Sequence, residues 1–283
     1  MPRLTFFARP SFLGNAWPGL TDETRLMRIH SRIRGEQMAR YLGVKFNPKE
    51  GFEDDLCIYV KPRHLRFMKE HDWVDIGDEW TLIKFVEPHT QIIAISQHNY
   101  DFLVERFPEN KIIIIPHQHV NWENAPREKR KVKVGGYLGG ISNVALPAYQ
   151  GIQARLKKLG FDFIFCFNFK NRQDNINFYQ SIDFLVIGVE GSNSWCGTPA
   201  KLINAASFSK PAVAFKQDHY KEFEGNYIPI SSLDEMEEEV LKFNNEDYYE
   251  EWSLKVREAA EPYHISKIAD MYLQLEKEFR SKL

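Results

Sequence analysis

The sequence predicts an α/β fold made of two domains, each with a parallel sheet wrapped by helices. Short apolar runs alternate with helical patterns from one end of the 283-residue chain to the other, which is the pattern of parallel strands joined by crossover helices. The alternation is interrupted once, by the polar segment 121–133, which contains Pro126 and has the composition of a linker. A chain of this length has room for two such domains.

The first half is expected to contain four strands, each a short apolar run, and three connecting helices. The strands are 4–8, 55–60, 91–96 and 111–116, and the helices are 21–42, 62–71 and 100–107. The run KIIIIP at 111–116 is uninterrupted, which is typical of a strand buried on both faces.

The expected helix over 21–42 is strongly basic. Either Thr21 or Asp22 is placed to cap its start. Two interpretations of its charge remain open, a solvated helix face or the lining of a site for an anionic ligand. Residues 25–40 carry five arginines against the single Glu36, namely Arg25, Arg28, Arg32, Arg34 and Arg40.

The second half repeats the alternation and ends in helices. Expected strands are 132–138, 161–168, 183–189 and 212–215, and expected helices are 146–159, 175–180 and 199–207, with a mainly helical remainder from Leu233. The amphipathic tail from His264 has no partner of its own, so we expect it to return to the first half. The predicted domains are 1–125, with 264–283 packed on it, and 126–263.

Composition and charge exclude several classes of protein. The chain is 43% hydrophobic and 14% aromatic, so it is neither disordered nor fibrous, and a net charge of −2 gives no general attraction to nucleic acid or membranes. The scattered Cys57, Cys166 and Cys196 lack CxxC spacing, which indicates a reducing compartment. No apolar stretch reaches the roughly 18 residues that span a bilayer. We therefore expect a cytoplasmic protein without a transmembrane segment.

Known catalytic motifs are missing from the sequence, and so is a metal-ligand cluster. There is no nucleophile elbow, Walker A run or HExxH. His117 and His119 face one side of an extended chain, but no third ligand stands near them. Neither a metal nor a resident cofactor is expected.

The most informative segment is 188–215. Its strand ends at Val189 in a Gly/Ser/Asn loop, at the edge where open α/β sheets bind ligands. Thr198 is expected to be the N-cap of the next helix and Pro199 its first residue. The free amides of that first turn, together with Lys201, suit a phosphate. Asn204 follows on the same helix face, within reach of a ribose hydroxyl.

The runs TPAKLINA at 198–205 and KPAV at 210–213 resemble the donor-binding motif of GT-B glycosyltransferases. The resemblance implies two Rossmann-like domains facing across a cleft, a nucleotide-sugar donor, a contact of Lys201 with the diphosphate and a contact of position 204 with the ribose. Many relatives have Glu where Asn204 stands, and Ser209 replaces a common Gly. The segments 135–143 and 93–120 resemble the same family.

These observations give a set of candidate site residues with assigned roles. Glu190 ends its strand beside the loop, and His117 lies next to the linker, so both are candidate catalytic residues. We assign the diphosphate to Gly139, Gly140, Thr198 and Lys201, the ribose or base to Asn204, Asn168 and Lys170, and the acceptor side to Ser11, Gly14, Asn15, His30 and Arg34.

The leading hypothesis is a glycosyltransferase that moves a sugar from a nucleotide-sugar to a hydroxyl-bearing acceptor without an obligatory metal. Two alternatives remain open. One is a related protein that binds a nucleotide or glycan with little turnover, motivated by Asn204. The other is a glycosyltransferase that modifies nucleic acid, motivated by the arginines of helix 21–42.

Overall fold

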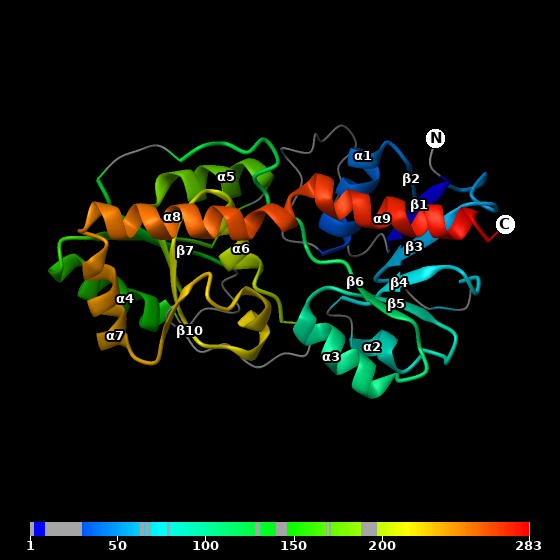
Figure 1. Cartoon of the computed structure of the whole chain (residues 1–283), viewed down its shortest axis with the longest axis horizontal. Coiled ribbons are helices and arrows are strands. Elements are labelled where there is room, and N and C mark those ends of the chain that lie inside the picture. The colour runs from blue at the N-terminus through cyan, green and yellow to red at the C-terminus, as the bar shows by residue number, and fades with distance from the viewer. Residues whose placement is uncertain are drawn as a thin grey trace. The chain divides into compact units, whose positions relative to one another are not determined.

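The computed structural model describes residues 3–8, 30–62, 65, 68–77, 80–127, 131–139, 146–167, 169, 171–187 and 197–282. These residues form two compact units, coloured along the chain in Figure 1. Unit 1 comprises Met1–Gln118, Ser194–Thr198 and Ile265–Leu283, and unit 2 comprises His119–Asn193 and Pro199–His264. Each contains a parallel sheet with helices, which confirms the predicted α/β class.

Unit 1 contains a six-stranded parallel sheet in the order β2-β1-β3-β4-β5-β6. Its strands are β1 (Leu4–Ala8), β2 (Lys45–Phe46), β3 (Leu56–Val60), β4 (Trp73–Asp75), β5 (Gln91–Ala94) and β6 (Ile112–Ile114). Its helical elements are the π-helix η3 (Arg32–Gln37), α1 (Met38–Leu42), α2 (Trp80–Ile83), α3 (Gln97–Arg106) and α9 (Ile265–Arg280).

The C-terminal helix α9 packs on unit 1, as expected from its amphipathic pattern. Its Tyr272 ring meets the Phe6 ring edge-on, with centroids 5.1 Å apart. The Glu276 carboxylate accepts a 2.7 Å hydrogen bond from the backbone N–H of Arg3. The end of the chain therefore covers the strand that begins it (Figure 1).

Unit 2 contains a five-stranded parallel sheet in the order β11-β10-β9-β7-β8. Its strands are β7 (Val134–Leu138), β8 (Asp162–Cys166), β9 (Phe184–Ile187), β10 (Ala212–Phe215) and β11 (Ile228–Ile230). Its helical elements are α4 (Leu146–Lys158), α5 (Arg172–Ser181), α6 (Ala200–Ser207), η5 (Asp218–Phe223), α7 (Leu233–Lys242), α8 (Glu246–Ala260) and η6 (Glu261–Tyr263).

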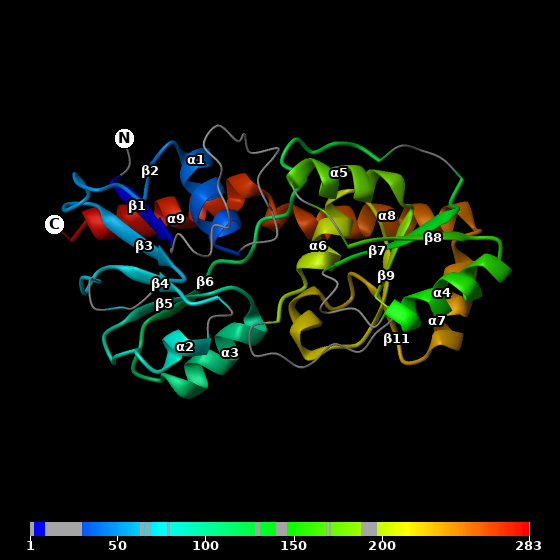
Figure 2. The same ribbon diagram turned by 180° about the vertical axis from the view of Figure 1, so that it is seen from behind.

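The main hydrophobic core of unit 2 lies between its sheet and helices α4 and α7, which are seen from behind in Figure 2. Ile152 and Leu156 of α4 and Met236 of α7 are buried against Phe163 and Phe184 of the sheet. Within the described ranges, no helix is both long and apolar enough to cross a membrane.

Two expected elements of the first half are wrong. The described residues of 62–71 form turns and bends rather than a helix, because the buried Asp72 carboxylate accepts from the backbone N–H groups of Lys69 and Cys57 and folds the segment onto β3. The run 111–116 is not buried on both faces. It supplies β6, an edge strand whose three isoleucines are only partly buried.

The basic helix is also not a solvated face where the structure describes it. Arg32 and Arg34 are buried in the π-helix η3, a rare element that is frequent at functional sites. Arg40 is exposed on α1, and Arg25 and Arg28 lie outside the described residues.

Candidate functional site

The strand order of unit 2 marks where a ligand is expected. The chain runs from β7 outward to β8 on one side and to β9, β10 and β11 on the other. The direction in which the chain adds strands therefore reverses beside β7. In open parallel sheets, ligands bind outside the carboxyl ends of the strands at such a reversal of strand order. Gly139 directly follows β7, and α6 is the next described helix after β9; these are the two segments that the sequence assigns to the diphosphate.

Helix α6 begins one residue later than the sequence suggests. Pro199 occupies the N-cap position, Ala200 is the first helical residue, and no side chain caps the helix. The predicted cap by Thr198 is therefore wrong, because the helical conformation starts after the proline. Without a side-chain acceptor, the first-turn N–H groups remain donors at the positive end of the helix dipole.

Lys201 lies in this first turn, against the end of β7. Its Nζ is 5.4 Å from the centroid of the Tyr137 ring, which is buried. The Tyr137 hydroxyl points toward Gly139, where an added Cβ would come within 2.5 Å of it. The Gly139 N–H donates to the Cys166 carbonyl at 3.1 Å, which fixes the turn after β7. Tyr137 thus lies beside both Lys201 and Gly139.

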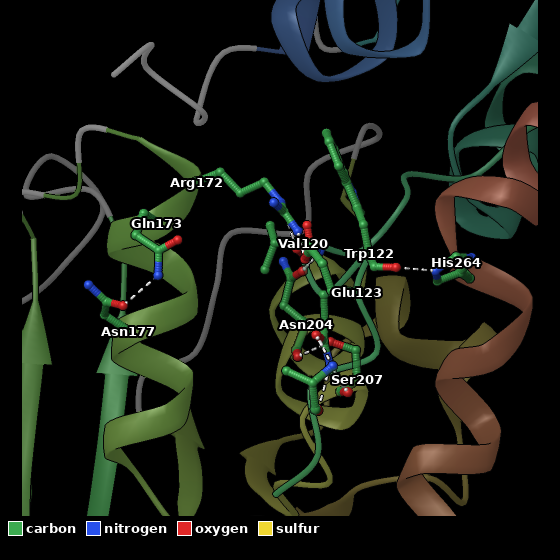
Figure 3. Close-up of polar contacts among 11 residues, drawn as sticks. Val120, Trp122, Glu123, Arg172, Gln173, Asn177, Asn204, Ser207 and His264 are labelled. Atoms are coloured by element: carbon green, nitrogen blue, oxygen red, sulfur yellow. Dashed lines mark hydrogen bonds and ion pairs between the residues drawn. The ribbon is translucent and has the colours of Figure 1, made fainter. Parts of the chain in front are cut away.

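Asn204, the predicted ribose contact, is tied to the backbone of unit 2. Its Oδ1 accepts a 2.9 Å hydrogen bond from the Val120 N–H (Figure 3). Its backbone carbonyl accepts from the Ser207 hydroxyl at 2.7 Å. The side-chain oxygen of Asn204 therefore has a structural partner, and its Nδ2 group remains as a donor.

The segment after His119 is hydrogen-bonded to α6 and α5 and lies in unit 2. The predicted boundary had placed residues up to 125 in the first domain. Asn121 Nδ2 donates to the Ser207 carbonyl at 2.6 Å. Arg172, the first residue of α5, donates from Nε to the Val120 carbonyl at 2.9 Å and lies 4.2 Å from the Trp122 ring centroid (Figure 3). Arg172 also forms an ion pair with Glu123.

His119 and His264 lie in unit 2, each next to a position where the chain passes to unit 1, and they are in contact with each other. The His119 N–H donates to the Tyr263 carbonyl at 2.9 Å, the two imidazole rings are 5.4 Å apart, and His264 Nε2 lies 2.8 Å from the Trp122 carbonyl oxygen (Figure 3). Burial, reinforced by His264 and Arg257, lowers the pKa of His119 to about 3. His119 is therefore neutral at physiological pH.

A second polar cluster lies at the carboxyl edge of the sheet in unit 1. Asp75 ends β4, and its fully buried carboxylate binds His30 Nε2 at 2.9 Å and the Nε of Arg34. Arg34 also donates to the Pro116 carbonyl at 2.8 Å. The ring of His117, the next residue, meets His30 edge-on with centroids 4.8 Å apart. Of the residues predicted in this half, His30, Arg34 and His117 are brought together.

The charges of this cluster set the protonation states of its members. Burial alone would raise the pKa of Asp75, but Arg34 and His30 hold it below its ordinary value. Burial lowers the pKa of His30, against the opposing effect of Asp75. Burial lowers the pKa of His117 well below its ordinary value, and His30 and Arg34 lower it further. Both histidines are thus neutral, and the carboxylate and guanidinium stay charged.

Sequence reasoning missed Asp75 and Tyr137, which hold predicted residues in place. Asp75 closes the three-residue strand WVD, and a carboxylate at the end of a buried strand was the available signal. Tyr137 sits in an apolar strand and gave no signal. Seven predicted residues lie outside the described part of the chain, namely Ser11, Gly14, Asn15, Gly140, Asn168, Lys170 and Glu190.

Comparison with known proteins gives structural relatives but no sequence relatives. No protein-family model matches the chain, and no curated protein matches it. A TarM variant from S. aureus, solved with fondaparinux, α-GlcNAc-glycerol and UDP, has a TM-score of 0.61 at 16% identity over 78% of this chain. The pneumococcal O-GlcNAc transferase GtfA, solved with UDP and GlcNAc, has a TM-score of 0.57 at 14% identity over 81%.

A glycosyltransferase from Rickettsia africae covers 99% of this chain and is itself covered to 99%, with a TM-score of 0.55 and 12% identity. The chain spans only 55% of TarM and 57% of GtfA. At such low identity these likenesses concern the fold. The chain has the two-sheet GT-B fold that its donor-motif resemblance implied.

Proposed function

We propose that this chain is a glycosyltransferase that moves a sugar from a nucleotide-sugar to the hydroxyl of an acceptor. The observation that carries the proposal is the uncapped start of α6, whose Lys201 lies against Tyr137, the strand residue that also borders the Gly139 turn in unit 2. The GT-B fold and the solved relatives, two of which were crystallised with UDP, support it.

In this proposal the donor diphosphate lies against the first turn of α6. Lys201 and the free amides stabilise the negative charge that develops on the diphosphate as the sugar departs. The neighbouring Gly140 and Thr198 complete the phosphate contacts, and the chain needs no resident metal or cofactor for this step. Asn204, Asn168 and Lys170 are assigned to the ribose and base.

Unit 1 supplies the acceptor side. We assign His117, whose ring is neutral at physiological pH because burial lowers its pKa, to the side of the acceptor hydroxyl as the candidate catalytic residue of this unit. Asp75 fixes His30 and Arg34 beside it. We assign acceptor binding to His30, Arg34 and the residues Ser11, Gly14 and Asn15, and a second catalytic role to Glu190.

A thermal-shift screen with UDP, GDP and ADP, followed by their glucose and N-acetylglucosamine derivatives, tests the donor site. A ligand that binds only the folded chain stabilises it by about 2.7 kcal/mol at a hundredfold excess over its dissociation constant. At least one nucleotide is expected to raise the melting temperature, with EDTA present as well as without it. If millimolar concentrations of every nucleotide leave the melting temperature unchanged, the proposal is wrong.

Binding with little turnover is a second candidate, favoured by the engagement of the Asn204 oxygen with Val120. The two functions differ in one measurement. Release of nucleoside diphosphate from a bound nucleotide-sugar in the presence of acceptor glycans identifies a transferase, whereas binding without release identifies the second candidate.

The nucleic-acid alternative loses part of its motive, since Arg32 and Arg34 are buried. Location in the cytoplasm is part of the proposal and rests on the scattered positions of Cys57, Cys166 and Cys196, which lack CxxC spacing.

A further inference from the structure

Tyr137 is a buried residue of β7 that lies between the two segments assigned to the diphosphate. Its ring packs against Tyr149 of α4, with centroids 4.2 Å apart. A second contact is with the Lys201 ammonium, 5.4 Å from the ring centroid. Its hydroxyl faces the position where Gly139 lacks a Cβ.

Lysine side chains need such a contact if their charge is to be held in one place. A lysine carries about 2 kcal/mol of rotamer entropy and a compact, strongly hydrated charge. Within the part of the chain that the structure describes, no hydrogen bond or ion pair restrains Lys201. The ring face of Tyr137 attracts the ammonium through its quadrupole, and the ring itself is held by Tyr149.

We infer that Tyr137 is a positioning residue of the donor site, whose ring holds the Lys201 ammonium at the end of β7 before a nucleoside diphosphate binds. The inference rests on the proposed function, because it assigns Tyr137 a part in that same site. Tyr137 acts through Lys201, so its ring matters and its hydroxyl does not. Pre-ordering the ammonium lowers the entropy lost on binding and thereby raises affinity.

Two variants separate the ring from the hydroxyl. Tyr137→Phe keeps the ring, and we expect the affinity for UDP or GDP, measured by calorimetry, to stay within about twofold of wild type. Tyr137→Leu removes the ring, and we expect about three- to tenfold weaker diphosphate binding, the scale of one cation–π contact. Uridine or guanosine binding is expected to be the same in all three proteins, because a nucleoside has no phosphate for Lys201.

A double-mutant cycle tests whether Tyr137 acts through Lys201. In a Lys201→Met background, Tyr137→Leu is expected to cause no further loss of diphosphate affinity. Equal losses in both backgrounds, equal losses for nucleoside and diphosphate, or a loss with Tyr137→Phe as large as with Tyr137→Leu would each overturn the inference.

A measurement on the free protein keeps the test independent of nucleotide binding and of the folding of Tyr137→Leu. In wild type and Tyr137→Phe, the NMR signal of the Lys201 ε-methylene group, assigned with Lys201→Met, is expected to be shifted upfield by the ring. A Lys201 signal among those of exposed lysines overturns the inference. If the Lys201 signal is shifted but the protein binds no nucleoside diphosphate, the contact between Tyr137 and Lys201 exists and the proposed donor site does not. The positioning role then fails as well, because there is no diphosphate for Lys201 to bind.

Discussion

Replacing Asp75 with Asn tests whether the polar cluster of unit 1 depends on one buried carboxylate. Asp75 is fully buried and binds both His30 and Arg34, whose side chain is also fully buried. Asparagine has the same shape but no charge. The His30 ring is able to change tautomer and keep a hydrogen bond, but the Arg34 guanidinium would stay buried without a counter-charge.

The expected cost follows from that uncompensated charge. Removing one partner of a buried ion pair destabilises a protein by about 3–5 kcal/mol, because the other charge stays in a low-dielectric environment. Removing both partners costs much less. Asp75→Asn is therefore expected to lower the free energy of unfolding by about 3–5 kcal/mol, or about 6–20 °C in melting temperature. The double variant Arg34→Met/Asp75→Asn is expected to recover part of that loss.

Urea and thermal unfolding followed by circular dichroism measure these differences. Asp54→Asn, an exposed carboxylate in the same unit, is the matched control and is expected to change stability by less than about 0.5 kcal/mol. Because Arg34 and His30 hold the pKa of Asp75 below its ordinary value, its stabilising effect is fully present above about pH 4 and is lost only at lower pH. A loss below about 1 kcal/mol, or a double variant as unstable as the single one, would refute this reasoning.

Three further predictions concern unit 2. Lys201→Ala is expected to weaken nucleoside diphosphate binding by about 1.5–3 kcal/mol in calorimetric titrations and to leave nucleoside binding unchanged. The exposed control Lys157→Ala is expected to change neither. Equal weakening for both ligands would place the phosphates elsewhere. Gly139→Ala is expected to abolish most diphosphate binding, since its Cβ would lie 2.5 Å from the Tyr137 hydroxyl, and unchanged affinity would show that this turn does not approach the ligand. The pKa of His119 falls to about 3 in the folded chain, so between about pH 6.5 and 3 the unfolded chain binds one more proton than the folded chain. The free energy of unfolding is therefore expected to fall by up to about 1.4 kcal/mol per pH unit as the pH decreases through that range. His119→Gln is expected to flatten this slope, and an unchanged slope would assign it to other groups.

Much of the fold could be predicted because strand and helix patterns are local. The runs 4–8 and 212–215 became β1 and β10 with the expected bounds. The three residues of β4 are too few to show a period, and they follow a segment whose turns depend on the distant contact of Asp72 with Cys57. The run at β6 shows a different limit, since hydrophobicity alone does not distinguish an edge strand from a central one.

Some residues of the candidate site are indicated by the local sequence, and others only by the folded structure. Lys201 and Gly139 could be proposed from the sequence because a helix start and a glycine turn after a strand are recognisable in the local sequence. Asp75 and Tyr137 act on residues that are near them only in the folded chain, 41 positions away for the Arg34–Asp75 pair. Predicting their roles needed the strand order, which periodicity does not supply.

The Asn204 side chain shows how a departure from the family motif fits the local structure. Its Oδ1 accepts from the Val120 N–H, and that bond fixes which way the amide points. The group left for a ligand is Nδ2, which donates, whereas the Glu of many relatives would only accept. A ribose hydroxyl is both a donor and an acceptor, so in the proposed donor site Asn204 would donate to the ribose where a Glu would accept. Under the proposed function, Asn at position 204 therefore reverses the direction of the hydrogen bond expected at the ribose.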